Sequence, residues 1–223
     1  NPFCLWSLEA LGWLGADNGD LVVVEGTLRD VVFADVRRGG KVYKLPAQIS
    51  GLYFLVGYRT PDHSYYERDL PGAGLIVWQI DERHQSNEDE RTKLVDLVSA
   101  DGLYADRGFP SGRVADPQFG ADNLDFWAHD RTYQRGHAGN LGDATDLFDG
   151  VRYTDFSVLS NPAAPPGISI GHIRRQAGRI VADLSAADRR WAGVILEDAV
   201  WQDTVEVVGD VLGPIQRWLG DES

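Results

Sequence analysis

The chain has 223 residues, of which 43% are hydrophobic and 25% are charged, and its formal net charge is −13. This length and composition are typical of one large folded domain, with or without a tail, and they exclude an intrinsically disordered chain. No apolar run approaches the roughly 20 residues that a transmembrane helix needs, so no membrane span is expected. The acidic excess argues against nucleic acid as a partner, because phosphate binding requires a basic surface.

The carboxylates are mostly short, with 25 Asp against 9 Glu. Aspartate suits turns and calcium loops, whereas glutamate suits helices, so this ratio favours a turn-rich and strand-rich protein. The single cysteine, Cys4, excludes a disulfide within the chain, and we expect either a buried free thiol or a bridge to another chain. Because the sequence contains no methionine, we expect Asn1 to follow a longer or processed upstream segment.

The N-terminal part of the sequence predicts one short helix followed by strands. Apolar residues at helical spacing predict an amphipathic helix over residues 3–14, which starts at Asn1-Pro2 and ends at Gly12 or Gly15. Four strand-like runs follow, over residues 21–25, 31–36, 41–45 and 52–59. Arg38-Gly39-Gly40 lies between the second and third runs and predicts a hairpin there.

The rest of the chain predicts further strands and one closing hairpin. Residues 74–80 are apolar almost throughout, which indicates a strand covered on both faces. Residues 82–93 are polar and indicate a solvated loop, and residues 94–100 predict a strand or a short helix. Residues 167–173 and 179–184 predict a hairpin. The expected fold class is α+β, predominantly antiparallel β with a short N-terminal helix.

Several common catalytic motifs are absent. The sequence has no P-loop, no G-x-G-x-x-G turn and no G-x-S-x-G elbow, so it does not predict a phosphate-binding loop or a serine hydrolase. It also has no H-E-x-x-H, and its 5 histidines are scattered without a helical pair that could bind zinc.

The most distinctive chemical feature is an aspartate-rich stretch over residues 116–155. Calcium takes six to eight oxygen ligands from carboxylates, amides and backbone carbonyls on flexible loops. The stretch supplies such oxygens, and the candidate calcium ligands are Asn140, Asp143, Asp146 and Asp149. The alternative is that these aspartates cap turns and keep the surface soluble.

Asp81 and Glu82 follow the apolar run at residues 74–80, a position where functional carboxylates are common. Paired with Asp96 or Asp101, Asp81 could form the two-carboxylate site of a glycosidase. The alternative is a strand-end carboxylate that binds backbone amides.

Five segments, in their order along the chain, carry a family resemblance. They are Asn1–Leu14 (NPFCLWSLEALGWL), Leu52–Arg59 (LYFLVGYR), Leu70–Glu82 (LPGAGLIVWQIDE), Lys93–Gly102 (KLVDLVSADG) and Asn140–Gly150 (NLGDATDLFDG). They resemble segments of the immune inhibitor A family of secreted bacterial zinc metallopeptidases, and the third is similar to that family's LPG-GLLIWHIDE segment. The resemblance covers roughly residues 1–186.

The resemblance implies a C-terminal part of a metallopeptidase-like domain over residues 1–186, followed by a linker or the start of a strand-rich module over residues 187–223. It also implies that Gln79 and Asp81 line the substrate cleft. The sequence departs from the family at Gln79, where the family has His, and at Gly57, where it has Glu. The family's zinc-binding H-E-x-x-H helix is expected upstream of Asn1.

The expected function is therefore to complete the fold and the substrate cleft of a secreted zinc endopeptidase, with a peptide or protein as substrate and the upstream part of the same precursor as partner. Without that upstream segment, and the zinc it would bring, the chain is not expected to cleave peptides. The alternative is a non-catalytic, calcium-stabilised extracellular module for surface display, adhesion or fibre formation. A glycan-active protein that uses Asp81 is the third alternative.

Overall fold

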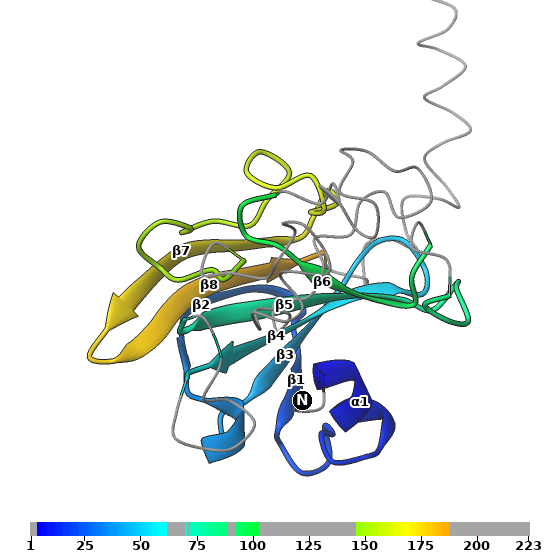
Figure 1. Ribbon diagram of the computed structural model, residues 1–223, viewed down its shortest axis with the longest axis horizontal. Coiled ribbons are helices and arrows are strands. Elements are labelled where there is room, and N and C mark those ends of the chain that lie inside the picture. Colours follow the sequence, from blue (N-terminus) through cyan, green and yellow to red (C-terminus); the bar gives the residue numbers. More distant parts are fainter. Residues whose placement is uncertain (1–3, 62–69, 71, 89–91, 103–145, 188–223) are drawn as a thin grey trace, which may run out of the picture. The chain divides into compact units, whose positions relative to one another are not determined.

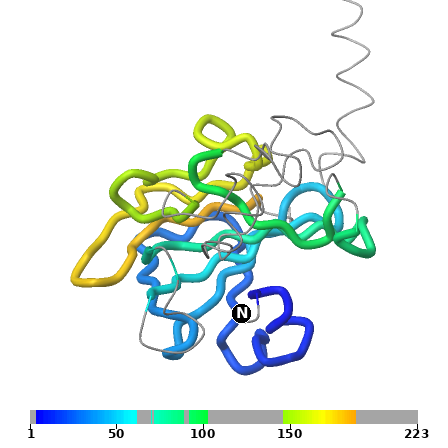
Figure 2. The backbone as a smooth tube through the Cα atoms, in the orientation of Figure 1, coloured from blue at the N-terminus to red at the C-terminus, as the bar shows by residue number. Residues whose placement is uncertain are grey.

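The computed structural model describes residues 4–61, 70, 72–88, 92–102 and 146–187. This part of the chain is built from two β-sheets and one short helix (Figures 1 and 2). None of its helices is long and apolar enough to cross a membrane. From residue 188 onward, the region expected to be a linker or an appended module lies outside the described residues.

The larger sheet has five strands and the smaller sheet has three. The larger one has the order β1 (Leu21–Val23), β3 (Val42–Pro46), β4 (Leu52–Arg59), β5 (Gly74–Asp81) and β6 (Val95–Val98). The smaller one has the order β2 (Gly26–Phe33), β8 (Arg179–Ala186) and β7 (Ser169–Gln176). β1 and β3 run parallel, and the other strand pairs are antiparallel. The expected β-rich fold, predominantly antiparallel with a short N-terminal helix, is confirmed for the described residues.

The central strands β4 and β5 are covered on both faces, as the apolar run at residues 74–80 predicts. Phe54 and Val77 point into a core shared with the three-stranded sheet. Their neighbours Leu55 and Ile80 face the opposite side and pack with Leu5 of the N-terminal helix. Because successive side chains of a strand alternate between its faces, one pair of strands serves both cores. The five-stranded sheet is thus the middle layer between the smaller sheet and the helix (Figure 1).

The helix α1 spans Leu5–Ala10, which is shorter than the predicted range of residues 3–14. Its N-cap is Cys4, whose Sγ accepts a hydrogen bond from the Ser7 backbone N–H. Its end is confirmed at Gly12, which has a φ of 70° directly after the C-cap Leu11. That left-handed conformation favours glycine and stops the helix.

The hairpin predicted at Arg38-Gly39-Gly40 is wrong, because β2 and β3 belong to different sheets. The chain instead makes a 3-10 turn over Val36–Arg38 and crosses from the smaller sheet to the larger one. Asp35 fixes this crossing: its carboxylate accepts hydrogen bonds from the Arg37 N–H at 2.9 Å and from the Thr60 N–H and hydroxyl at 3.0 and 2.7 Å. The Gly39-Gly40 pair is therefore part of a turn that crosses between two sheets. The sequence alone does not distinguish such a turn from a hairpin turn.

The closing hairpin is confirmed, with β7 and β8 joined through Ala177 and Gly178. The strand at residues 52–59 has the predicted bounds, and residues 94–100 contain a strand rather than a helix. The strand predicted at residues 31–36 actually begins at Gly26 and already ends at Phe33. Its first residues are largely exposed, so the apolar pattern that marks a buried strand is missing there.

Gly40 gives a direct test of the crossover turn. A Cβ at Gly40 would lie 2.0 Å from the Ala34 carbonyl oxygen, a backbone atom that cannot rotate away. We expect Gly40→Ala to lower the free energy of unfolding by about 3 kcal/mol. Urea denaturation measures this change.

The matched control is Gly15→Ala, because a Cβ at Gly15 meets no atom closer than 3.9 Å. This variant should stay within about 0.5 kcal/mol of the unmodified chain. Equal stabilities of the two variants would contradict the described crossover.

Candidate functional site

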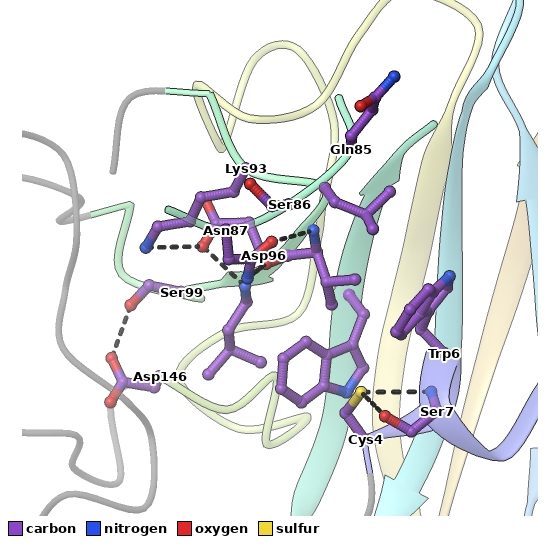
Figure 3. Close-up of a pocket in the computed structure, with 14 residues that line it drawn as sticks. Cys4, Trp6, Ser7, Gln85, Ser86, Asn87, Lys93, Asp96, Ser99 and Asp146 are labelled. Carbon is purple, nitrogen blue, oxygen red and sulfur yellow. Dashed lines mark hydrogen bonds and ion pairs between the residues drawn. The ribbon is translucent and has the colours of Figure 1, made fainter. Parts of the chain in front are cut away.

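A pocket of about 530 Å³ lies on the α1 side of the five-stranded sheet (Figure 3). Among the described residues it is bordered by the first turn of α1, by β5 at Trp78, and by β6 with the loop before it. β6 is the terminal strand of the sheet among the described strands, and Ser99 and Asp146 close the far end of the pocket. The described residues that line it are Cys4, Trp6, Ser7, Trp78, Gln85, Ser86, Asn87, Lys93, Leu94, Val95, Asp96, Leu97, Ser99 and Asp146. Two indoles thus share one pocket with amide, hydroxyl and carboxylate groups, a combination common in ligand sites.

Along β6, polar side chains bind the backbone on the pocket side. The Asn87 side-chain amide donates to the Val95 carbonyl at 2.7 Å, and its Oδ1 accepts from the Val95 N–H at 2.9 Å. The Leu97 N–H donates to the Asp96 carboxylate at 3.0 Å, and the Lys93 ammonium lies 3.7 Å from the same carboxylate oxygen. These contacts satisfy backbone groups that a neighbouring strand would otherwise bind.

A buried polar cluster fixes the other end of the pocket. The Ser99 hydroxyl lies 2.6 Å from the Asp146 carboxylate and 2.9 Å from that of Asp101, and Figure 3 shows the first contact. The Asn161 side-chain amide donates to the Ser99 carbonyl at 2.8 Å. Asp146, Ser99 and Asn161 are all buried. The cluster ties the chain segment after β6 to two segments that lie far along the sequence.

Asp146 and Asp149, two of the four candidate calcium ligands, lie in the described part of the chain. The Asp149 Oδ1 accepts the backbone N–H groups of Val151, Arg152 and Tyr153 at 2.8–3.1 Å, which closes a tight turn. Burial acts to raise the pKa of the Asp149 carboxyl, but these donors hold that pKa below its usual value. The carboxylates of Asp146 and Asp149 thus have different partners.

Asn140 and Asp143, the other two candidate ligands, lie outside the described residues. Within the described ranges, no group of three or more His, Cys, Asp or Glu side chains is arranged to hold a metal ion. The calcium site therefore stays a prediction.

Asp81 lies at the end of β5 and is 4% exposed. Its carboxylate accepts two hydrogen bonds from the Arg83 guanidinium, at 2.7 and 2.5 Å, and one from the Arg83 N–H at 3.2 Å. The His84 Nε2 lies 3.4 Å from the same carboxylate. The Arg83 hydrogen bond holds the pKa of Asp81 below its usual value, against the effect of burial. These contacts show how the turn after β5 is held together.

Gln79 lies two residues before Asp81 on β5 and is half-buried. In the sheet it pairs with Phe54 on one side and with Asp96 on the other. Neither Gln79 nor Asp81 is among the described residues that line the pocket. Their role in a substrate cleft therefore stays a prediction, and the pocket forms at Trp78 and along β6.

The three carboxylates considered for a glycosidase pair engage separate partners. Asp81 binds Arg83, Asp96 binds Lys93, and Asp101 contacts Ser99. Cys4 is a free thiol in this chain and is half-buried rather than fully buried as expected. Its Sγ lies 3.1 Å from the Ser7 hydroxyl at the pocket rim (Figure 3).

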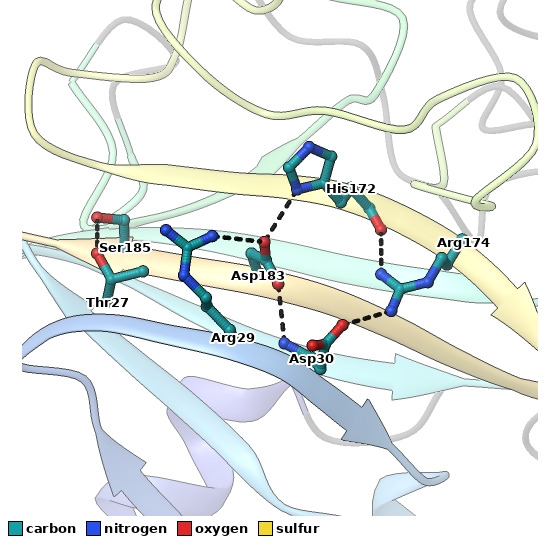
Figure 4. A network of polar contacts seen from close by, with 7 residues as sticks. All are labelled: Thr27, Arg29, Asp30, His172, Arg174, Asp183 and Ser185. Atoms are coloured by element: carbon teal, nitrogen blue, oxygen red, sulfur yellow. Dashed lines mark hydrogen bonds and ion pairs between the residues drawn. The ribbon is translucent and has the colours of Figure 1, made fainter.

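The sequence did not indicate a second polar network, which lies on the three-stranded sheet (Figure 4). β2 and β7 each bulge where they pass Asp183 of the middle strand β8, and Asp30 and His172 have φ values of 52° in these bulges. Asp183 accepts the Asp30 N–H at 2.8 Å and contacts the His172 Nδ1 at 2.9 Å. Arg174 joins the two bulges through the Asp30 carboxylate and the His172 carbonyl.

These contacts hold the pKa of Asp183 below its usual value, with the Asp30 N–H as the largest cause. More than 140 residues separate the partners on β2 from those on β7 and β8, so no local pattern marks the network. The network joins β2, β8 and β7 at two facing β-bulges. At each bulge the regular hydrogen bonding between neighbouring strands is interrupted.

Comparisons of the chain with protein-family models, with curated proteins and with solved structures found no match.

The Asp81 contacts predict a pH dependence of stability. A carboxyl whose pKa is lowered by folding stabilises the native state above its unfolded pKa of about 3.9, and this contribution is lost as the pH falls through the lower native value. We expect Asp81→Asn to lower the free energy of unfolding by about 2 kcal/mol at pH 7, because the charge-assisted bonds to Arg83 are lost. Urea denaturation from pH 7 to pH 2.5 should show this difference shrinking below about pH 4.

Asp17→Asn is the control, because Asp17 is exposed. It should change stability by less than about 0.5 kcal/mol at every pH. An Asp81→Asn difference that stays constant down to pH 2.5 would rule out the ionised Asp81–Arg83 contact as its source.

Proposed function

We propose that the chain is the C-terminal part of a secreted zinc endopeptidase domain similar to the immune inhibitor A family. In this role it completes the fold and lines part of the cleft for a peptide or protein substrate. The observation that carries the proposal is the convergence of the segments that resemble the family. Leu52–Arg59 forms β4, Leu70–Glu82 contains β5, and Lys93–Gly102 contains β6, so three of the five segments are neighbouring strands of one sheet.

The other two segments meet the same sheet wherever they are described. α1, from the first segment, packs on β4 and β5 through Leu5. Phe148, from the fifth segment, forms a β-bridge with Leu75 of β5, with backbone N–O distances of 3.0 and 3.2 Å. Segments that are scattered along the sequence thus gather around β5, the strand with the most specific resemblance. The bridge from the fifth segment to β5 is the most informative of these contacts, because consecutive strands such as β4, β5 and β6 often pair in any case. It supports the shared fold that the resemblance implies.

The described residues of this chain do not fit a catalytic zinc ion. Such a site needs three protein ligands, and the described ranges offer no suitable group of His, Cys, Asp and Glu. Gln79, at the position of a family histidine, has an amide in place of an imidazole. The proposal therefore assigns zinc and the general base to an upstream segment with H-E-x-x-H, and it assigns fold completion to this chain.

The proposal predicts that the coding sequence upstream of Asn1 contains H-E-x-x-H within about a hundred residues, on the helix that such zinc enzymes use. The precursor expressed with this segment should bind one zinc ion per chain and cleave fluorescein-labelled casein. Phenanthroline should abolish the cleavage, and added zinc should restore it. Zinc content by mass spectrometry and casein fluorescence are the two measurements.

The matched control is a precursor in which the glutamate of H-E-x-x-H is changed to glutamine, which keeps both zinc ligands and removes the general base. It should bind zinc and lose cleavage. An upstream sequence without H-E-x-x-H would disprove the peptidase proposal.

A second candidate function is a non-catalytic extracellular module that is stabilised by calcium. Two departures from the family favour it. Gln79 is half-buried opposite Phe54 of the core, and Gly57 leaves room that Val36 and Leu5 fill, since a Cβ there would lie 2.9 and 3.1 Å from their side chains. Positions that carry His and Glu in the family thus serve packing here.

Calcium binding predicts that removing the ion destabilises the chain. A ligand that binds the native state raises the melting temperature, so 5 mM EGTA should lower it by about 5 °C. In Asp143→Ala combined with Asp146→Asn, this EGTA effect should disappear. Asn at position 146 keeps an oxygen acceptor for Ser99, so the variant separates the loss of calcium from the loss of the buried bond.

The control for calcium is Asp17→Asn, an exposed aspartate far along the sequence from the candidate loop. It should keep the full EGTA effect in differential scanning fluorimetry. Melting curves of the unmodified chain that coincide with and without EGTA would disprove the calcium site.

A further inference from the structure

The pocket beside β6 contains an arrangement that points to one class of ligand. In the sheet order of the described strands, β6 is terminal, so the outer side of its backbone faces the pocket. In an antiparallel edge strand, alternate residues direct their N–H and C=O groups away from the sheet. In β6 these residues are Val95 and Leu97, which both line the pocket.

Asn87 occupies the place of a neighbouring strand at Val95. Its carboxamide accepts from the Val95 N–H at 2.9 Å and donates to the Val95 carbonyl at 2.7 Å. A strand added to the edge would offer the same donor and the same acceptor to this residue. Asn87 belongs to the exposed loop before β6, so its side chain can leave the edge without unfolding the sheet.

The pocket next to this edge suits an apolar side chain. Trp6 of α1, Trp78 of β5 and Leu97 of β6 contribute apolar surface to it. Lys93 and Asp96, two ionic residues that line the pocket, lie with 3.7 Å between the ammonium and the carboxylate. A neutral ligand therefore avoids disturbing a charge pair.

We propose that the outer edge of β6 is a binding site for an extended, uncharged peptide segment, which displaces the Asn87 side chain from Val95 and places an apolar side chain between Trp6 and Trp78. Backbone hydrogen bonds to the Val95 N–H and carbonyl and to the Leu97 carbonyl hold the peptide as an added strand, while the Leu97 N–H keeps its bond to the Asp96 carboxylate. The two indoles select the side chain. The site uses this chain's own residues and requires neither zinc nor calcium. It therefore goes beyond the proposed function and can be tested separately.

The test uses the full chain labelled with ¹⁵N and the capped peptide Ac-Ser-Val-Leu-Thr-Ser-NH2. Titration should shift the amide resonances of Val95 and Leu97 in a saturable way. N-methylation of the leucine nitrogen removes one backbone donor and should weaken binding about tenfold. Replacing the leucine with alanine should weaken it by a similar factor, because the contact with the indoles is lost.

The decisive variant is Asn87→Ala. If Asn87 contacted the ligand directly, this variant would bind more weakly. In the proposed site the Asn87 side chain competes with the peptide for Val95, so its removal should tighten binding about threefold or more. Asn18→Ala is the matched control, because Asn18 is an exposed asparagine that is not among the described lining residues. It should leave the affinity unchanged. Trp6→Leu, which keeps an apolar residue in α1, should weaken binding while the circular dichroism spectrum is preserved.

Three results would overturn the proposal: no saturable shift at Val95 and Leu97, equal affinity of the N-methylated peptide, or weaker binding by Asn87→Ala. Sugars are a second class of ligand that stacks on indole rings, so a parallel titration uses the oligosaccharide chitotetraose. If the saccharide shifts these resonances and the peptide does not, the pocket binds sugars and the peptide site is disproved. Failure of this experiment leaves the zinc test of the precursor unaffected.

Discussion

The two-sided burial of β4 and β5 is the constraint on which the rest of the described structure depends. Phe54, Leu55 and Val56 are fully buried although they point alternately to opposite faces, so each face of this strand needs its own cover. The three-stranded sheet covers one face and α1 covers the other. The Glu9–Lys44 ion pair, 2.8 Å long, fastens that helix to β3. The smaller sheet and the helix are therefore required by the middle layer rather than added to it.

Polar contacts at the strand ends complete this layering. Asp35 holds the crossover into β3, Asp81 holds the turn after β5, and Asp146 binds Ser99 beyond the end of β6. All three carboxylates are buried, and each has its hydrogen bonds from a nearby loop or strand end. Buried charges are stable only with such partners. The aspartate excess in the composition is thus used, at these three positions, to connect loops to sheets.

The sequence predicts those parts of the fold that depend on burial along one strand. β4 and β5 can be predicted because each contains a long run of apolar residues, Leu52–Val56 and Leu75–Trp78. The β7–β8 hairpin can be predicted because a Gly turn joins two alternating runs. The partner of β2 could not be predicted, since its exposed residues carry no pattern and its partner β8 lies some 150 residues away. The pocket could not be predicted for the same reason, because Trp6 lies far along the sequence from Trp78 and Asn87. In the sequence Asn87 is one of several polar loop residues, and only the structure shows that its side chain binds the Val95 backbone.

Two positions at which the sequence differs from the family it resembles, Gly57 and Gln79, have distinctive surroundings in this structure. Gly57 of β4 lies against Leu5 of α1 and Val36 of the crossover turn, and a glutamate there would collide with both side chains. Gln79 faces Phe54 across the sheet, where an uncharged side chain is easier to bury than a charged one. The central strands thus carry a glycine and an uncharged amide at these two positions, while several polar groups that line the pocket lie on β6 and on the loop before it. Within the described chain, the middle of the larger sheet serves stability, and its β6 edge keeps the chemistry for recognising a ligand.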